Sequence, residues 1–369
     1  ASRGLANMGC NASKRAQPSG GVASKSGVVW LEKGGDEFRT VLARNREHGD
    51  CPVRLIDAHH LIKLAEGGGR LVHRQKLPEE AFLSPETLTQ MDAGPGGSLR
   101  VVVVSYPWLQ PDHPDPHGQT LRLLARVLKA YIDAKGGTCG VFLDFCSLHQ
   151  KGANGEPRTT PEAGLFGMAL GCLSDWYSHP KTIVLKLTKM PEGYPSGFTF
   201  AEGTTPNTAD YYGRGWCFKE SSVACLVKDF DFCLDLGKLG DETKRWGDIA
   251  RECQAGRAAP LTPEDFMVEL ERKSFTSKKA DLPTVGGLYK TAFTKRFGKA
   301  RILYYASLGW GDAQMISLSS PRTKLGVGLF WWVAAAGGCW WAQLHHVGTS
   351  ACSWRSLLAG AAHVALRAA

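Results

Sequence analysis

Three short, uninterrupted apolar runs constrain the fold of this chain more than any other feature. They are LRVVVVSY from residue 99, GVFLDF from residue 140 and KTIVLKL from residue 181. Continuous runs of this kind are typical of β-strands that are buried on both faces, as in a parallel sheet. The sequence therefore predicts a sheet with both faces covered.

Helical patterns separate these runs. Residues 119–137 place Leu121, Leu124, Leu128 and Tyr131 on one helical face and end in two glycines. Strands that alternate with helices imply right-handed crossovers. We therefore expect an α/β fold, doubly wound around a mainly parallel, flavodoxin-type sheet with helical flanking segments.

A second predicted helix spans residues 159–180. Thr160 is expected to cap this helix, with Pro161 in its first turn. Its predicted inner face consists of Phe166, Leu170, Leu173 and Tyr177.

The composition divides the rest of the chain. Leu61, Leu64 and Ala65 share one helical face, and a glycine run at 67–69 stops that helix. The first residues are rich in Gly, Ser and Ala. They have too few large apolar side chains to offset the entropy that is lost when a chain becomes ordered. The expected parts are a disordered lead (1–27), a leading helix and linker (28–98), the α/β core (99–235), a helical basic extension (236–322) and an apolar tail (323–369).

The tail is rich in Trp, Gly and Ala, and residues 325–342 carry no charge. This approaches the roughly 20 apolar residues that a membrane-spanning helix needs, and tryptophans suit a membrane interface. We expect a membrane segment at 325–345, with a docked apolar tail or an error in the sequence as the alternatives.

The net charge bears on whether the chain binds nucleic acid, and the cysteines bear on zinc binding, disulfide bonds and cellular location. The formal net charge of +9 at pH 7 is spread along the chain, so a solvated surface is expected and nucleic acid is not. The 11 cysteines include no CxxC pair, which argues against a zinc module and a disulfide scaffold. We expect free thiols and an intracellular location, cytoplasmic or membrane-associated through the tail.

Polar and aromatic residues follow each of the three predicted strands. In an open α/β sheet, ligands bind outside the carboxyl ends of the strands. These residues are therefore expected to line one cleft. The candidates for substrate binding are Ser105, Tyr106, Trp108, Asp144, Tyr212, Arg214 and Trp216, with Glu220 beside them.

Glu220 is the unusual member of this set. If Trp216 opens a helix, Glu220 lies in an otherwise apolar stripe with Val223 and Val227. A buried carboxylate must be paired, protonated or used chemically. It can stabilise an oxocarbenium-like centre or hold a ribose hydroxyl, beside flat aromatic rings.

Arg214 offers a second interpretation of the same stretch. Its guanidinium can bind a phosphate, or it can form an ion pair with Glu220 that serves only the fold. The spacing leaves both roles open.

Other chemistries are not favoured. Ser105 and Cys146 lack the context of a hydrolase nucleophile. The loop that holds His113 and His117 is proline-rich, so its two aspartates, Asp112 and Asp115, are expected to cap the following helix and not to bind a metal.

The order of four motifs resembles the heterokaryon-incompatibility domain, whose fold is similar to that of Toll/interleukin-1 receptor (TIR) domains. The motifs are VVVVSYPW, VFLDFCSLHQ, WYSHPKTIVL and RGWCFKE. Arg214, Trp216 and Glu220 match the R-x-W-x-x-x-E of the first family, in which Asp144 and Gln150 also keep their spacing. Trp216, Cys217 and Glu220 match the W-C-x-x-E of plant-type TIR domains, whose glutamate cleaves NAD. The loop PWLQPDHPDPHG and an insertion at about 190–209 depart from the family pattern.

The resemblance implies a signalling or stress-response domain that hydrolyses NAD or NADP at the nicotinamide–ribose bond, with Glu220 as the catalytic carboxylate. NAD or NADP would be the substrate, and no bound cofactor or metal is expected. One alternative is a non-enzymatic interaction domain that self-associates and pairs Glu220 with Arg214. A further alternative is a membrane-tethered adaptor.

Overall fold

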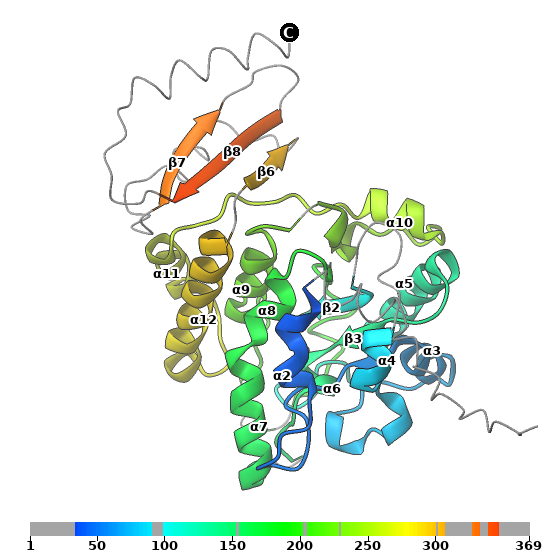
Figure 1. The fold of residues 1–369 in the computed structure, drawn as a ribbon. Coiled ribbons are helices and arrows are strands. Elements are labelled where there is room, and N and C mark those ends of the chain that lie inside the picture. Colours follow the sequence, from blue (N-terminus) through cyan, green and yellow to red (C-terminus); the bar gives the residue numbers. More distant parts are fainter. Residues whose placement is uncertain are drawn as a thin grey trace, which may run out of the picture.

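The computed structural model describes residues 34–90, 99–152, 155–200, 202, 205–228, 230–299, 302–306, 327–332 and 339–346. The predicted lead, 1–27, lies outside these residues. The described chain forms a central sheet between two layers of helices, with a small second sheet near its C-terminal end (Figure 1).

The central sheet has five strands in the order β1-β3-β2-β4-β5. Four of them are parallel, and β1 pairs antiparallel with β3 at one edge. Among the four parallel strands, the first in the chain, β2, lies in the middle of the sheet. The chain then adds β3 on one side of β2, and β4 and β5 on the other side, which is the flavodoxin-type order. This confirms the predicted α/β fold. The strands are β1 (Ile56–Asp57), β2 (Val101–Ser105), β3 (Gly140–Phe142), β4 (Ile183–Lys186) and β5 (Cys233–Asp235).

Both faces of the sheet are buried because alternate side chains of β2 enter different cores. Val101 and Val103 belong to one apolar cluster, and Val102 and Val104 to the other. The second cluster lies under α3 (Ala58–Glu66), α5 (Gln119–Lys135) and α10 (Trp246–Glu252). The first lies under α2 (Arg39–Leu42), α8 (Leu173–Ser178), α9 (Gly215–Ala224), α11 (Pro263–Glu271) and α12 (Lys278–Lys299).

The helix predicted from residue 159 differs from the expectation in two ways. Thr159, and not Thr160, is its N-cap and forms a capping box with Glu162. The helix is also interrupted at Cys172, which divides it into α7 (Thr160–Gly171) and α8. Of the predicted inner face, Leu173 and Tyr177 are buried, whereas Phe166 and Leu170 are half-buried.

The flanking segments complete the core. Residues 28–98 are more than a helix and a linker, because they also supply the edge strand β1. Tyr289 and Phe293 of α12 are buried in the same cluster as Trp176 of α8. The remaining short elements are η1 (Gly35–Phe38), η2 (Arg74–Lys76), η3 (Glu79–Ala81), α4 (Pro85–Gln90), α6 (Asp144–Ser147), η4 (Phe230–Phe232) and η5 (Leu236–Lys238).

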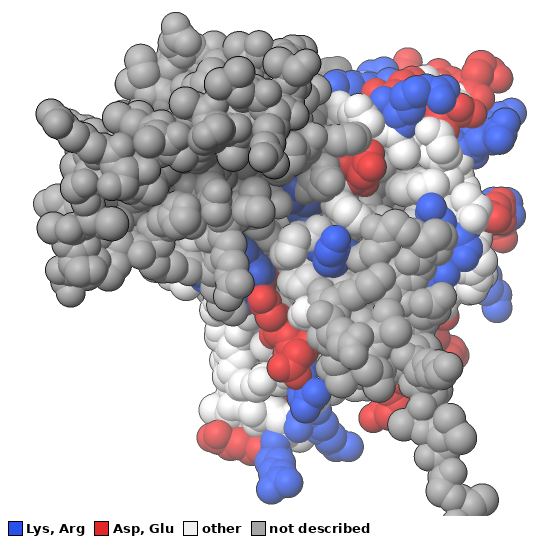
Figure 2. Space-filling model, turned by 45° about the horizontal axis from the view of Figure 1, so that its top comes forward, with Lys and Arg blue, Asp and Glu red and all other residues white. Residues whose placement is uncertain are grey.

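The basic residues of α12 are not only a solvated face. Lys295 lies 2.8 Å from Asp175, and Arg296 lies 3.0 Å from Glu37 and is buried. On the face of the molecule in Figure 2, the visible Lys and Arg side chains are interspersed with Asp and Glu. The positive charge is therefore partly used to join α12 to the N-terminal segment and α8.

The tail departs from the predicted membrane helix. Its described residues form β7 (Val327–Trp332) and β8 (Cys339–His346), which pair antiparallel, and β8 also pairs with β6 (Ile302–Ala306). The rest of the predicted segment, 325–345, lies outside the described residues. In the part of the chain that the structure describes, no helix has both the length and the apolar character to cross a bilayer.

Candidate functional site

A cleft of about 460 Å³ lies beyond the carboxyl end of β2. Its walls come from the loop after β2, from α6 and α7, from the start of α9 and from the segment that leads into α12. The switch in strand order beside β2 is where ligands of doubly wound sheets bind. Six of the eight predicted site residues line this cleft: Tyr106, Trp108, Asp144, Arg214, Trp216 and Glu220.

Glu220 lies in the cleft wall and is 7% exposed. Its Oε2 atom accepts a hydrogen bond from Ser105 Oγ at 2.6 Å. Ser105 Oγ is also 2.6 Å from the hydroxyl of Tyr211. Ser105 is fully buried and does not line the cleft. It therefore orients the carboxylate from behind and is not placed to touch a ligand.

Burial raises the pKa of Glu220, while the charge of Lys219 and hydrogen bonds from Ser105 and Tyr177 oppose that increase. Lys219 is fully buried, and burial lowers its pKa. Its Nζ atom has no hydrogen-bond partner among the described residues and lies 5.4 Å from the centre of the Tyr177 ring. The carboxylate is thus held in an apolar wall with one buried cation nearby, an environment typical of a functional acid.

Arg214 is not the partner of Glu220. Its Nε atom donates to the carbonyl of Ala209 at 2.8 Å, and Nη2 donates to the Tyr194 hydroxyl at 3.1 Å. Nη1 donates to the carbonyl of Trp108. The structure does not have the Arg214–Glu220 ion pair that was one of the two interpretations, and the guanidinium instead joins the loop after β2 to the insertion before α9.

Asp144 is a second carboxylate in the cleft wall, and its charge also raises the pKa of Glu220. Its carboxylate accepts hydrogen bonds from the Tyr106 hydroxyl at 2.7 Å and from Trp108 Nε1 at 3.0 Å. It also accepts from the backbone N–H of Phe145 at 2.6 Å. Burial raises the pKa of Asp144, and these hydrogen bonds oppose the increase. Asp144 therefore fixes the two aromatic rings, a role that the sequence did not distinguish from ligand binding.

Tyr212 lies outside the cleft wall, and Asp115, in the loop that holds His113 and His117, has a capping role. Tyr212 is 44% exposed, is not in the cleft wall, and accepts a hydrogen bond from Lys186 Nζ at 3.3 Å. Asp115 accepts from the backbone N–H groups of Thr120 and Leu121, at 2.9 and 3.1 Å. The predicted capping of α5 by an acid of this loop is confirmed for Asp115.

One wall of the cleft was missed by the sequence reasoning. It comes from the basic extension and from α7, far from the motifs in sequence. The only local signal is Gly215, where an added Cβ would lie 1.9 Å from the ring of Phe275, so glycine is needed for this approach. The residues of this wall are Phe166, Leu170, Ser274, Phe275, Thr276, Ala280, Asp281 and Thr284.

Comparison of the chain with family models, with curated proteins and with solved structures finds no match.

Proposed function

We propose that this protein is a TIR-like signalling or stress-response enzyme that hydrolyses NAD or NADP at the nicotinamide–ribose bond, with Glu220 as the catalytic carboxylate. The observation that supports this most is the position of Glu220 in the wall of an aromatic cleft, hydrogen-bonded to Ser105 and not to Arg214. If Glu220 served only the fold, we would expect its carboxylate to pair with Arg214 and not to line a cavity.

The proposed chemistry needs one carboxylate and one water molecule. The glycosidic C–N bond breaks, and nicotinamide leaves with its electron pair. Ionised Glu220 stabilises the positive charge that develops on the ribose, as carboxylates do in glycoside hydrolysis. The water oxygen then bonds to the anomeric carbon and releases its proton to solvent. Trp216 and Tyr106 offer flat, apolar surface around this centre.

The non-enzymatic interaction domain is the competing proposal. It relied on Glu220 as the structural partner of Arg214, and that contact is replaced by the hydrogen bonds of Arg214 to Ala209, Trp108 and Tyr194. The geometry of Glu220 therefore favours the enzyme.

The test is the release of nicotinamide from NAD and from NADP by the purified full chain at high protein concentration. We expect wild-type turnover, and a loss of about 100-fold or more in Glu220→Gln and Glu220→Ala. Glu264→Gln, which changes an exposed glutamate on α11, is the matched control and is expected to retain activity. A folded, concentrated wild type that releases no nicotinamide would favour the interaction domain.

A further inference from the structure

A second cavity, of about 600 Å³, adjoins the cleft that contains Glu220. The two cavities share the side chains of Trp108, Pro111, Gln150 and Arg158. The second cavity also takes in residues 70–76 of the N-terminal segment, which lie outside the motifs discussed above. A ligand that fills both cavities would contact the lysines and arginines of the second cavity and the carboxylate of Glu220 in the first.

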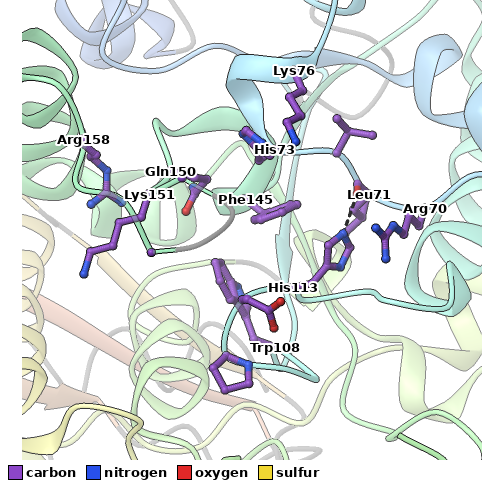
Figure 3. Close-up of a pocket in the computed structure, with 15 residues that line it drawn as sticks. Arg70, Leu71, His73, Lys76, Trp108, His113, Phe145, Gln150, Lys151 and Arg158 are labelled. Carbon is purple, nitrogen blue, oxygen red and sulfur yellow. Dashed lines mark hydrogen bonds between the residues drawn. The ribbon is translucent and has the colours of Figure 1, made fainter. Parts of the chain in front are cut away.

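Four cationic side chains lie in the wall of this second cavity. Arg70, Lys76, Lys151 and Arg158 line it, against a single carboxylate, Asp112. Figure 3 shows Lys151 and Arg158 on one side and Arg70 on the other, with Phe145 between them. No ion pair in the described part of the chain involves any of these four cations. Their charge is therefore available to an anionic ligand.

Arg158 is fixed in place although it forms no ion pair with a residue that the structure describes; Glu162 is the carboxylate whose charge acts on it from a longer distance. Its guanidinium stacks on the ring of Phe166, with 3.6 Å between Cζ and the ring centre. Its Nε atom donates to the carbonyl of His149 at 2.6 Å. The two terminal nitrogen atoms have no hydrogen bond to any residue that the structure describes. A preorganised guanidinium fork with two free donor groups matches the geometry of a phosphate.

We propose that this basic cavity binds the diphosphate of a nucleotide, with Arg158 as the main phosphate contact, Lys151 on the same side of the cavity and Lys76 farther along its wall (Figure 3). The volume is in the range of cavities that hold small ligands. The position of Arg158 at the shared wall would direct the ribose beyond the diphosphate into the cleft, toward Glu220. This last step alone depends on the proposed function, because a diphosphate site would exist whether or not NAD is cleaved.

The test is isothermal titration of the full chain with ADP and, separately, with adenosine. We expect ADP to bind and adenosine, which has the same base and ribose without the diphosphate, to bind at least about tenfold more weakly. Arg158→Gln should weaken ADP binding about tenfold or more and leave adenosine unchanged. Arg251→Gln is the matched control because it removes an equal charge from an exposed position on α10.

A second variant guards against loss of folding. Lys76 and Lys151 are both exposed, so the double substitution K76Q/K151Q should leave the fold intact and weaken ADP binding several-fold. The proposal is overturned if wild type binds ADP no better than adenosine, or if neither Arg158→Gln nor the double variant weakens ADP.

The two proposals fail in distinguishable ways. ADP binding that depends on Arg158, in a protein that does not release nicotinamide, would support the diphosphate site and reject the glycohydrolase. Nicotinamide release that depends on Glu220, in a protein whose affinity for ADP changes neither in Arg158→Gln nor in K76Q/K151Q, would do the reverse.

Discussion

The two adjoining cavities differ in how their charged side chains are engaged. In the cleft around Glu220, three charged groups of the predicted motifs are hydrogen-bonded within the protein: Arg214 to loop carbonyls, Asp144 to two aromatic side chains and Glu220 to Ser105. In the basic cavity, the cations have no ion-pair partners in the described chain, and neither terminal nitrogen atom of Arg158 is hydrogen-bonded to a residue that the structure describes. The hydrogen bonds of the first cavity fix the position of one carboxylate, Glu220, whereas the cations of the second cavity can bind an anionic ligand.

The comparison of Arg214 with Arg158 shows why residue type alone does not identify a ligand contact. Both are arginines in the cleft wall. Arg214 is buried and uses all three of its nitrogen atoms on the protein. Arg214 therefore uses three of its five N–H groups on the protein and is only 5% exposed. Among the described residues only Nε of Arg158 has a hydrogen-bond partner, so its two terminal nitrogen atoms remain for a phosphate.

The largest effect that would sharpen this comparison is on stability. Arg214→Ala removes three hydrogen bonds of a buried guanidinium and leaves two half-buried carbonyl groups without this donor, so we expect a loss of about 3 kcal/mol in the free energy of unfolding. Urea unfolding measures it. Arg272→Ala, at an exposed ion pair on the surface, should cost about 0.5 kcal/mol or less. Equal effects of the two substitutions would contradict the structural role of Arg214.

A smaller effect is expected from Ser105→Ala, through the pKa of Glu220. The hydrogen bond from Ser105 lowers that pKa, which burial has raised above its ordinary value of 4.5. If the ionised form is active, nicotinamide release rises with pH through the pKa of the folded protein. Removal of the hydrogen bond raises the pKa further, so the acid limb of the pH profile should move to higher pH.

The same variant should also lower the maximal rate about tenfold, because the carboxylate loses an orienting contact. Ser222→Ala is the matched control, since this serine of α9 donates to the carbonyl of Phe218 and not to Glu220. A profile that keeps its midpoint in Ser105→Ala would show that Ser105 does not set the ionisation of Glu220.

The smallest effect is the dependence on ionic strength. Lys76 and Lys151 are exposed, so salt screens their attraction for a diphosphate. Raising NaCl from about 0.05 to about 0.5 M should increase the KM for NAD about threefold or more. In the K76Q/K151Q variant this dependence should be weaker. An unchanged salt dependence would remove these two lysines from the ligand contact.

Much of the fold could be predicted from the sequence because it depends on local patterns. The apolar runs at 99, 140 and 181 became β2, β3 and β4, and the face of Leu121, Leu124, Leu128 and Tyr131 is buried in α5. The edge strand β1 was missed because two residues carry no periodicity. The C-terminal apolar run was interpreted as a membrane helix from its uncharged length and its tryptophans, whereas its described residues pair as strands.

The site was predicted less completely, because its partners are distant in sequence. The apolar stripe around Glu220 indicated a buried carboxylate, and the structure has one. The partners of Arg214 are carbonyl groups of Trp108 and Ala209, and backbone acceptors leave no signature in the residue types. Arg158 was missed because its stacking on Phe166 depends on how the chain enters α7.

The most direct measurement is the separate determination of kcat and KM for NAD in Glu220→Gln and in Arg158→Gln. If the first cavity performs the chemistry and the second binds the diphosphate, Glu220→Gln should lower kcat about 100-fold or more with little change in KM. Arg158→Gln should raise KM about tenfold with kcat nearly unchanged. Wild-type kcat in Glu220→Gln, or a loss of kcat alone in Arg158→Gln, would contradict this division between the two cavities.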